Sequence, residues 1–355
     1  RLKEIRKKIL VHTDMSPTAG YREGKKSLHL SSKRGEVMHP CPSMSSEYIC
    51  CSVQVLETVS NCSFECSYCF LQNYLNDGRM VVVGNIKGIM QEVRQKIEAE
   101  PWRFFRIGTW ELGDSLALEP LTGAASELVE AFASLPNAAL ELKTKSDSVD
   151  ELLGLNHGGR TVVAWSLNPS AVIRSEEHGT ADLESRIKAM EKVAEAGYLI
   201  GVHFDPMITY PDWELGYAGL VRQVFQAIPA ERIAWISIGS LRFNPEMKKT
   251  IEDNFPGSRI TVAEMILGPD GKVRYVKPIR LSLYRRMYET IHRYGLEDNL
   301  VYLCMERWDV WKRVFGDYPV SIGHLDYLIT ESLYKRYPGL VHQAPDRSLY
   351  DPQLA

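Results

Sequence analysis

The sequence lacks the features that would place a chain in a special class at once. No apolar run reaches the roughly 18 residues that a membrane-spanning helix needs, and no signal-peptide pattern opens the chain. Cysteine is scarce, with 7 in 355 residues, so the fold does not depend on a disulfide scaffold. The net charge is −3, which gives the chain no overall basic character for binding nucleic acid. We expect an ordinary soluble, cytoplasmic protein without a membrane partner, and composition leaves a local basic groove open.

Three of the cysteines lie in one short stretch, Cys62-Ser-Phe-Glu-Cys66-Ser-Tyr-Cys69. The spacing C-x3-C-x2-C on a tight loop suits an iron–sulfur cluster, which thiolates hold. Because a [4Fe-4S] cluster has four irons, three cysteines leave one iron open for chemistry, by the logic that separates catalytic from structural zinc sites. A zinc site with a remote fourth ligand is the alternative. The cluster-type spacing also indicates a reducing cytoplasm.

This motif resembles the signature of the radical S-adenosylmethionine (SAM) superfamily, C-x3-C-x-aromatic-C. The resemblance implies that SAM chelates the open iron and that an electron from a reducing donor of flavodoxin or ferredoxin type cleaves it. The product is a 5′-deoxyadenosyl radical that abstracts hydrogen from a substrate. By the same resemblance, Tyr68 lies beside the adenine of SAM. An electron carrier or a structural staple built on the same cluster is the alternative from another class.

Residues 1–52 are basic at first and then polar, and they contain the other early cysteines. The positive residues predict either an arm that touches an anionic substrate or an extension that wraps the domain. Cys41, Cys50 and Cys51 lack the spacing of a second cluster, so we interpret them as packing residues. The basic residues concerned are Arg1, Lys3, Arg6, Lys7, Lys8, Lys25, Lys26, Lys33 and Arg34.

Regular secondary structure is predicted from Val53 onward, from short apolar runs and from amphipathic helical runs. The predicted strands span Val53–Thr58, Phe104–Gly108, Ala139–Thr144, Thr161–Ser166, Tyr198–Phe204 and Ile233–Ile238. The predicted helices between them span Asn85–Ala99, Leu121–Leu135, Val149–Leu155, Ala181–Ala196 and Glu214–Ile228. Strands that alternate with helices indicate parallel βαβ units and an α/β fold. The number of strands is lower than in a closed (β/α)8 barrel, and the resemblance implies the partial (β/α)6 barrel of radical SAM enzymes.

The pattern loosens after about Arg242. Helices are predicted over Asn244–Asn254, Leu281–Tyr294 and Arg307–Phe315, and a short strand over Leu300–Cys304. We therefore divide the chain into an N-terminal extension (residues 1–52), the partial barrel (53–241) and a C-terminal extension that closes the barrel mouth (242–355).

Polar residues follow the predicted strands, and in such folds the working groups come from the carboxyl ends of strands. Glu111 and Asp114 follow the second strand and could bind the ammonium of SAM or orient substrate, or cap the next helix as ordinary loop acids. Lys145 follows the third strand and is our candidate partner for the SAM carboxylate. Ser166 and Asn168 end the fourth strand with groups suited to hydrogen bonds with ribose or carboxylate.

Candidate substrate-binding residues lie at the end of the fifth strand and in the C-terminal extension. His203 and Asp205 share one face of their strand, as a substrate clamp or an acid/base pair; a core histidine with satisfied hydrogen bonds is the alternative. The stretch from Val273 to Arg280 mixes cations with an aromatic ring, which can grip phosphates and stack on a base. A solvated helix face is its plainer interpretation. The candidates in this region are Arg242, Tyr275, Lys277 and Arg280.

The order of segments is also similar to the spore photoproduct lyase family of DNA-repair enzymes. The similar pieces run from the cysteine loop to about Pro256 and include Lys145-Ser-Asp-Ser-Val-Asp-Glu-Leu-Leu153, Ser166-Leu-Asn168 and Trp213-Glu-Leu-Gly-Tyr217. The resemblance implies reversal of a thymine–thymine adduct, with a cysteine thiol quenching the product radical, and it places Lys145 and Ser166 at SAM-contacting positions.

The sequence departs from that family at two positions. Glu111 occupies the position where the resemblance predicts the hydrogen-donating cysteine. Phe70 occupies the position of a tyrosine that would relay the radical, so Tyr68 is the one relay residue that remains. One interpretation keeps the repair of a pyrimidine photoproduct, with Cys304 or another group as hydrogen donor. The other keeps the cofactors but changes the substrate to a small molecule or a modified nucleotide, with His203, Asp205 and Glu111 shaping the pocket. Cys304 itself is either a buried packing residue or a thiol at the barrel mouth.

Overall fold

The computed structural model describes residues 20–33, 35–42, 47–296 and 300–351. The basic residues Arg1, Lys3, Arg6, Lys7, Lys8 and Arg34, for which an arm or a wrapping extension is predicted, lie outside these ranges. The described helices include none that is long and apolar enough to cross a membrane.

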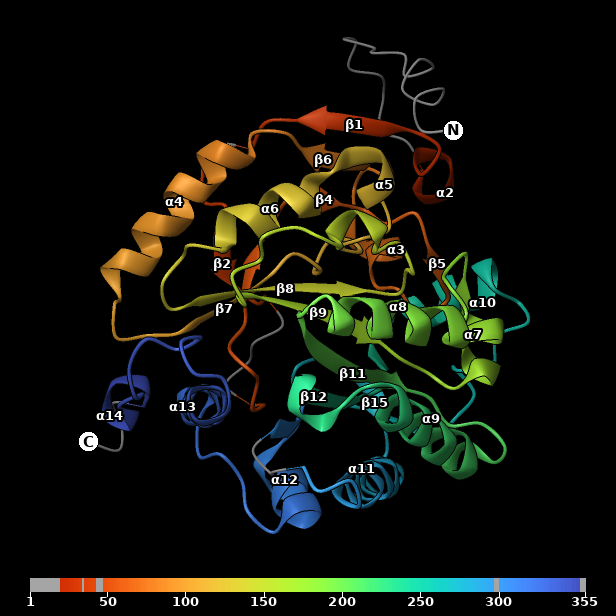
Figure 1. Cartoon of the computed structure of the whole chain (residues 1–355). Helices are drawn as coiled ribbons and strands as arrows, with labels where there is room; N and C mark the ends of the chain where they lie inside the picture. The colour runs from red at the N-terminus through yellow and green to blue at the C-terminus, as the bar shows by residue number, and fades with distance from the viewer. Residues whose placement is uncertain (1–19, 34, 43–46, 297–299, 352–355) are drawn as a thin grey trace.

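The main sheet curls into a half-barrel with helices along its outer side (Figure 1). The strands of this sheet, in spatial order and within the described residues, are β16 (Val301–Leu303), β12 (Ile233–Ser240), β11 (Leu199–Met207), β9 (Thr161–Ser166), β8 (Ala138–Thr144), β7 (Phe105–Gly108), β3 (Gln54–Leu56) and β2 (Met38–Pro40). All neighbours pair in parallel except β2, which runs antiparallel to β3. The expected partial α/β barrel is confirmed, and the short strand near residue 301 extends its sheet.

The long outer helices cover the sheet through apolar stripes. Five apolar side chains of α4 (Ile86–Ala99), at spacings of three and four, are buried. Burying each contributes about 1.5–3 kcal/mol relative to leaving it in water. The other helices on the barrel are α6 (Ala124–Phe132), α8 (Leu183–Glu195), α9 (Trp213–Ala227), α11 (Lys277–His292), α12 (Trp308–Phe315) and α13 (Ile322–Arg336).

Short elements complete the described chain. The helical ones are α2 (Tyr21–Gly24), α3 (Leu71–Tyr74), α5 (Glu119–Thr122), α7 (Ser170–Glu176), α10 (Met247–Asn254), α14 (Arg347–Tyr350) and two 3-10 turns, Asp150–Leu152 and Ala230–Arg232. Minor sheets are formed by β1 (Leu28–Ser31), β6 (Met80–Val83) and β4 (Val59–Ser60), by β10 (Glu177–His178) and β5 (Glu65–Cys66), and by β13 (Arg242–Phe243), β15 (Val273–Tyr275) and β14 (Met265–Leu267).

Several boundaries differ from the sequence prediction. The helix expected over Val149–Leu155 is only a 3-10 turn, and α11 begins at Lys277, where Pro278 lies in its first turn. The strands β1, β2 and β6 and the helix α13 were not predicted. Both extensions contribute to the main sheet, because β2 comes from residues 1–52 and β16 from residues 242–355. The three-part division of the chain stays a prediction.

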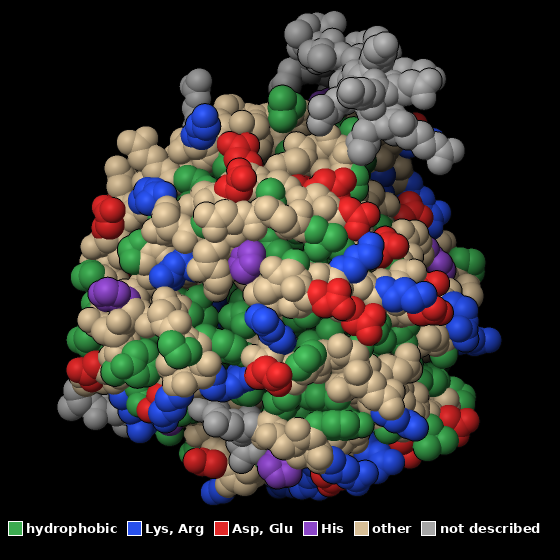
Figure 2. All heavy atoms as spheres, viewed as in Figure 1, with side chains coloured by type: hydrophobic (Ala, Val, Ile, Leu, Met, Phe, Trp, Pro, Cys, Tyr) green, Lys and Arg blue, Asp and Glu red, His purple; other side chains and the backbone are tan. Residues whose placement is uncertain are grey.

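The surface viewed in Figure 2 mixes acidic and basic side chains over the outer helices. This agrees with the near-neutral composition.

Candidate functional site

The strand register brings the predicted strand-end residues to one face of the sheet. His203 is paired with Ser166 on β9 and with Ser237 on β12, and Lys143 is paired with Ala164. Because side chains alternate with a period of two, Lys145 shares this face with Ser166 and His203. Lys145, Ser166 and His203, selected at the ends of different strands, therefore lie on one face of the sheet.

The cysteine motif forms a loop that is pinned at several points. Its strand β5 pairs antiparallel with β10, so that Cys66 lies opposite Glu177. The Ser67 hydroxyl donates to Glu176 on α7, and the Cys62 amide donates to the Asn61 side chain at 2.8 Å. The loop is thus held by residues more than a hundred positions further along the chain.

Burial disfavours the thiolate form of Cys62 and Cys66. It raises the pKa of Cys66 to about 12, and Lys145 partly opposes it, while burial and then Asp114 raise the pKa of Cys62 well above its usual value. No disulfide is recorded for the motif cysteines within the described chain. Thiols of this kind ionise on binding a metal, so the donor set fits an iron–sulfur cluster.

The zinc site with a remote fourth ligand stays an alternative. Among the described residues, no three His, Cys, Asp or Glu side chains are grouped closely enough to bind a single metal ion. A cluster needs no such grouping, because each thiolate binds its own iron.

A buried polar network holds Tyr68 behind the cysteine loop. The Tyr68 hydroxyl and the Asn168 side chain, the latter at 2.9 Å, both donate to one oxygen of Glu177. Arg186 pairs with the other oxygen at 2.6 Å and also donates to the Ser166 carbonyl at 2.9 Å. Burial alone would raise the pKa of Glu177, but Arg186 and Lys145 outweigh it and hold that pKa below its usual value. The predicted residues Tyr68, Ser166 and Asn168 are therefore brought together.

Sequence analysis missed Glu177 and Arg186. A signal for Arg186 was present, because it lies in helical register with Met190 and Val193 of the predicted apolar stripe. A charge in that stripe must be paired. Glu177 carries no such signal, because its role depends on the pairing of β10 with β5.

Both carboxylate oxygens of Asp114 accept hydrogen bonds from neighbouring residues. One carboxylate oxygen accepts from the Thr144 hydroxyl at 2.6 Å and from two loop amides, and the other accepts from the Lys145 amide at 2.7 Å. These contacts with loop amides agree with the predicted alternative that Asp114 caps its own loop. They also fix the turn that carries Lys145. The Lys145 ammonium lies 5.7 Å from the centre of the Tyr68 ring. Direct contact of Asp114 with SAM stays a prediction.

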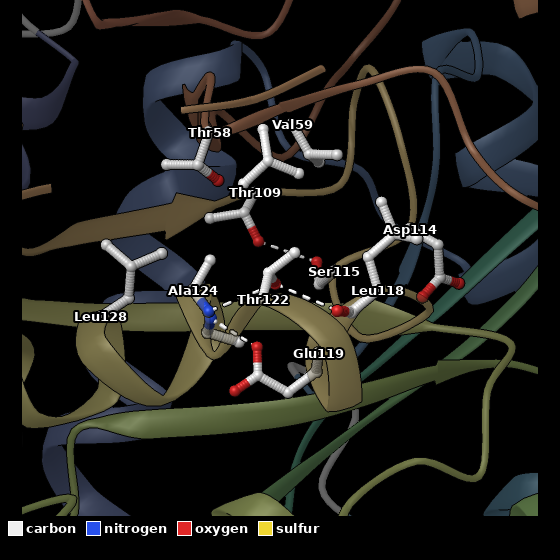
Figure 3. Close-up of a pocket in the computed structure, with 12 residues that line it drawn as sticks. Thr58, Val59, Thr109, Asp114, Ser115, Leu118, Glu119, Thr122, Ala124 and Leu128 are labelled. Carbon is white, nitrogen blue, oxygen red and sulfur yellow. Dashed lines mark hydrogen bonds between the residues drawn. The ribbon is translucent and has the colours of Figure 1, made fainter. Parts of the chain in front are cut away.

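A small pocket adjoins Asp114 on the far side of this turn. Figure 3 shows it lined by Thr58, Thr109, Ser115 and Thr122, with Asp114 at its margin. Glu119 lies below it and accepts hydrogen bonds from the first amides of α6, which is a structural role. The pocket contains none of the cysteines of the motif.

Cys304 lies with Arg242 and Asp205 at the carboxyl ends of the strands. Arg242 donates to the Cys304 sulfur at 3.3 Å and forms an ion pair with Asp205 at 3.5 Å. Burial, and then the charge of Asp205, raise the pKa of Cys304 well above its usual value. Cys304 packs partly buried against the core and also contacts Arg242, so both predictions for this thiol stay open.

Glu111 lies near Arg242, and His203 lies near Asp205. Burial raises the pKa of Glu111, against the nearby cations Lys143, Lys272 and Arg242. His203 is buried and lies 2.6 Å from the Glu141 carboxylate. This contact matches the predicted alternative of a satisfied core histidine, and a role in substrate binding stays a prediction.

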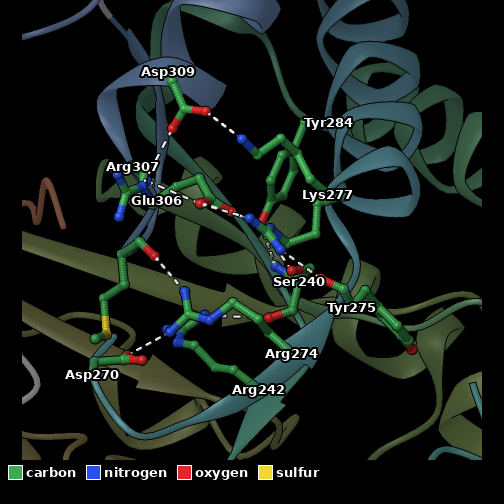
Figure 4. Close-up of polar contacts among 12 residues, drawn as sticks. Ser240, Arg242, Asp270, Arg274, Tyr275, Lys277, Tyr284, Glu306, Arg307 and Asp309 are labelled. Carbon is green, nitrogen blue, oxygen red and sulfur yellow. Dashed lines mark hydrogen bonds and ion pairs between the residues drawn. The ribbon is translucent and has the colours of Figure 1, made fainter. Parts of the chain in front are cut away.

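The predicted phosphate and base site between Val273 and Arg280 is not formed as expected. Figure 4 shows the side chains of Arg274 and Lys277 turned toward the acidic partners Asp270 and Asp309. Tyr275 is fully buried, so it has no face open for stacking on a base, and that prediction is wrong. Arg280 is buried in an ion pair with Glu306 at 2.8 Å, which leaves its charge compensated. Lys277 pairs with Asp309 at 2.6 Å nearer the surface, and its role stays a prediction.

The cysteines of the N-terminal extension are buried, as predicted. Cys41, Cys50 and Cys51 are each at most 7% exposed. A hydrogen bond from Cys50, and then the charge of Arg106, lower the pKa of Cys51.

Comparisons with known proteins agree with one another. The family model for spore photoproduct lyase matches residues 15–303. The spore photoproduct lyase of Bacillus subtilis (strain 168) is 27% identical over 244 residues, which is 68% of this chain and 69% of that protein. The spore photoproduct lyase of Geobacillus sp. (strain Y412MC61) is 26% identical over 249 residues, 69% of this chain and 71% of that protein.

Solved structures show the same fold. A double mutant of spore photoproduct lyase with bound AdoMet and dinucleoside spore photoproduct superposes with a TM-score of 0.68 at 24% identity. The match covers 84% of this chain and 87% of that one.

Proposed function

The chain belongs to the spore photoproduct lyase family and is a radical SAM enzyme, and from that premise we propose that it repairs a pyrimidine photoproduct with Cys304 as the hydrogen donor. Cys62, Cys66 and Cys69 would hold a [4Fe-4S] cluster, and Lys145 and Ser166 would contact SAM. When bound, these cofactors supply a 5′-deoxyadenosyl radical. The structure of the relative with AdoMet and a dinucleoside spore photoproduct supports this combination of ligands.

The observation that carries the proposal is the environment of Cys304. A hydrogen-atom donor must keep its S–H bond, and burial together with Asp205 raises the pKa of Cys304 so that the thiol stays protonated at neutral pH. Arg242 and Asp205 fix the sulfur at the strand ends. The S–H bond of Cys304 breaks as a C–H bond forms on the product radical, leaving a thiyl radical on sulfur. One electron and one proton restore the thiol, and we propose a flavodoxin- or ferredoxin-type donor as the electron source.

The other residues have supporting roles in this proposal. Glu177 and Asn168 hold the Tyr68 ring beside the cysteine loop, and Asp114 orients the turn that carries Lys145. Glu111, with Arg242, would border the substrate.

A second candidate is the same radical chemistry on a different substrate, such as a modified nucleotide. It is favoured by Glu111, a half-buried carboxylate at the position where sequence similarity predicts the donor cysteine of the family.

The test uses anaerobically reconstituted protein with SAM, a reductant and a dinucleoside spore photoproduct. We expect 5′-deoxyadenosine and repaired thymine from the parent protein. Cys304→Ser, whose O–H bond is too strong to donate, should still form 5′-deoxyadenosine but lose thymine repair. Cys41→Ser, a buried thiol in the N-terminal extension, is the matched control and should repair like the parent.

Each other outcome removes one part of the proposal. Repair by Cys304→Ser at the parent rate would exclude Cys304 as the donor. SAM cleavage without consumption of the dinucleoside would leave the second candidate. A protein that carries a cluster but forms no 5′-deoxyadenosine would be an electron carrier.

A further inference from the structure

The helix α2 packs directly on the cysteine loop. Gly24 approaches Gly78 so closely that an added Cβ would lie 2.0 Å from the Gly78 carbonyl carbon. The same Gly78 carbonyl accepts a hydrogen bond from Asn61, and Asn61 accepts from the Cys62 amide at 2.8 Å. A continuous set of contacts, through the Gly78 backbone and the Asn61 side chain, therefore joins α2 to the first cysteine of the motif.

Lys25, at the end of α2, places a positive charge on the loop. Its ammonium donates to the carbonyl of Phe64, which lies midway between Cys62 and Cys66. The ammonium also lies 4.1 Å from the centre of the Tyr21 ring, so its position is fixed from two sides. The negative charges that act on Lys25 come from the loop itself, from the three cysteines and from Glu65. Its charge is therefore directed at the loop.

Tyr21 adds a polar hydrogen on the same side. Its hydroxyl oxygen is buried and lacks a hydrogen-bond partner among the described residues. The Lys25 ammonium that contacts the Tyr21 ring also donates to the Phe64 carbonyl, which places the phenol beside the cysteine loop. A buried hydroxyl without a partner costs stability unless something at the site accepts its hydrogen bond.

We propose that Lys25 and Tyr21 form a cap that raises the reduction potential of the cluster held by Cys62, Cys66 and Cys69. The inference rests on the proposed function only in that these cysteines hold an iron–sulfur cluster. Reduction adds an electron, so a nearby ammonium and a phenol O–H beside the loop that is free to donate to the cluster stabilise the reduced form more than the oxidised one. Net charge, hydrogen bonds to sulfur and exposure are the factors that set the potentials of such clusters.

The experiment measures the midpoint potential of the reconstituted cluster without SAM, by redox titration followed by electron paramagnetic resonance. Lys25→Met removes the charge at similar length, and Tyr21→Phe removes only the hydroxyl. Both should shift the midpoint potential to more negative values. Lys26→Met is the control, because Lys26 is exposed and pairs with Glu23 on the surface at 2.7 Å. It should keep the parent potential.

Equal midpoint potentials in the parent, Lys25→Met and Tyr21→Phe would overturn the cap, whatever the catalytic activity. Should Lys25→Met fail to retain iron, Tyr21→Phe decides the matter, since a phenylalanine ring fills the same space. A parent protein that binds no iron and sulfide would instead overturn the proposed function. The two failures are thus distinguishable.

Discussion

Glu177 has a fully buried carboxylate, and it stabilises the site through the groups that it contacts. It balances the charge of Arg186, whose side chain is also fully buried, and it accepts from Tyr68. Glu177→Gln leaves that guanidinium without its counter-charge, and breaking a buried pair costs about 3–5 kcal/mol. We expect a loss of that size in the free energy of unfolding, measured with urea, and weaker SAM binding because Tyr68 is released.

Glu184→Gln is the matched control for this residue. The chemical change is identical, but Glu184 pairs with Lys188 on the exposed face of α8. Surface pairs contribute about 0–1 kcal/mol, so little change is expected. Comparable losses in both variants would show that the Glu177 network does not hold the site.

Single residues also show how far the sequence alone could be interpreted. Asp205 and Cys304 were selected at the ends of predicted strands and Arg242 as a cation for an anionic ligand. The structure brings the three together, since parallel strands end on one edge. Tyr275 and Arg280 were selected for their chemical type, which reveals neither the burial of Tyr275 nor the partner that Arg280 already has. Glu306, the partner of Arg280, lies 26 residues away.

At the scale of elements, the packing of α2 on the cysteine loop can be tested without a cofactor. Gly24→Ala forces a methyl group against the Gly78 backbone, and overpacking of this kind costs about 1–3 kcal/mol. The strain is local, so α2 should open more often while the barrel remains folded. We expect trypsin to cleave after Lys25 and Lys26 about ten times faster or more, measured by mass spectrometry, since 1.4 kcal/mol corresponds to a factor of ten.

Gly20→Ala provides the comparison, because nothing lies within 4 Å of its added Cβ. Cleavage of that variant should match the parent. An unchanged rate in Gly24→Ala would mean that α2 is not docked as described.

The elements differ in how well the sequence predicted them, for a physical reason. The strands of the βαβ units are continuous apolar runs bounded by turns, and Thr161–Ser166 was located without error. By contrast, β1 and β2 are only 4 and 3 residues long, and they exist because β6 and β3 offer them backbone partners. Pairing between distant segments leaves no local pattern, so the incorporation of the N-terminal extension into the sheets could not be predicted.

At the scale of the whole molecule, the two ends of the barrel carry different kinds of contact. The carboxyl ends of the strands carry the proposed site, whereas α13 and α14 pack on the amino ends. Arg336 donates to the Ile233 carbonyl at 2.9 Å, and the Phe104 amide donates to the Tyr350 hydroxyl at 2.8 Å. On α13, Asp326 pairs with Arg103 at 3.3 Å just before β7. This end therefore affects stability rather than chemistry.

Asp326 makes the stability of the barrel depend on pH. Burial raises its pKa to about 6, although Arg103 and Arg106 oppose the shift. In the unfolded chain its pKa is about 3.9, so between about pH 4 and pH 6 the folded protein binds more protons than the unfolded one. Stability from this group is therefore present below about pH 4 and is lost as the pH rises to about 6. The loss amounts to about 3 kcal/mol, because each pKa unit corresponds to about 1.4 kcal/mol.

Asp326→Asn removes this titration and keeps the shape of the side chain. We expect the stability of the variant, relative to the parent, to rise by about 3 kcal/mol between pH 4 and pH 6 and then to stay level. Urea unfolding of both proteins across that range measures the difference, in which the titration of all other groups cancels. Asp150→Asn serves as the control, because Asp150 pairs with Lys192 on the surface. If the curves of the parent and Asp326→Asn run parallel, Asp326 is already ionised below pH 4 and the amino end of the barrel is more open to water than the fold indicates.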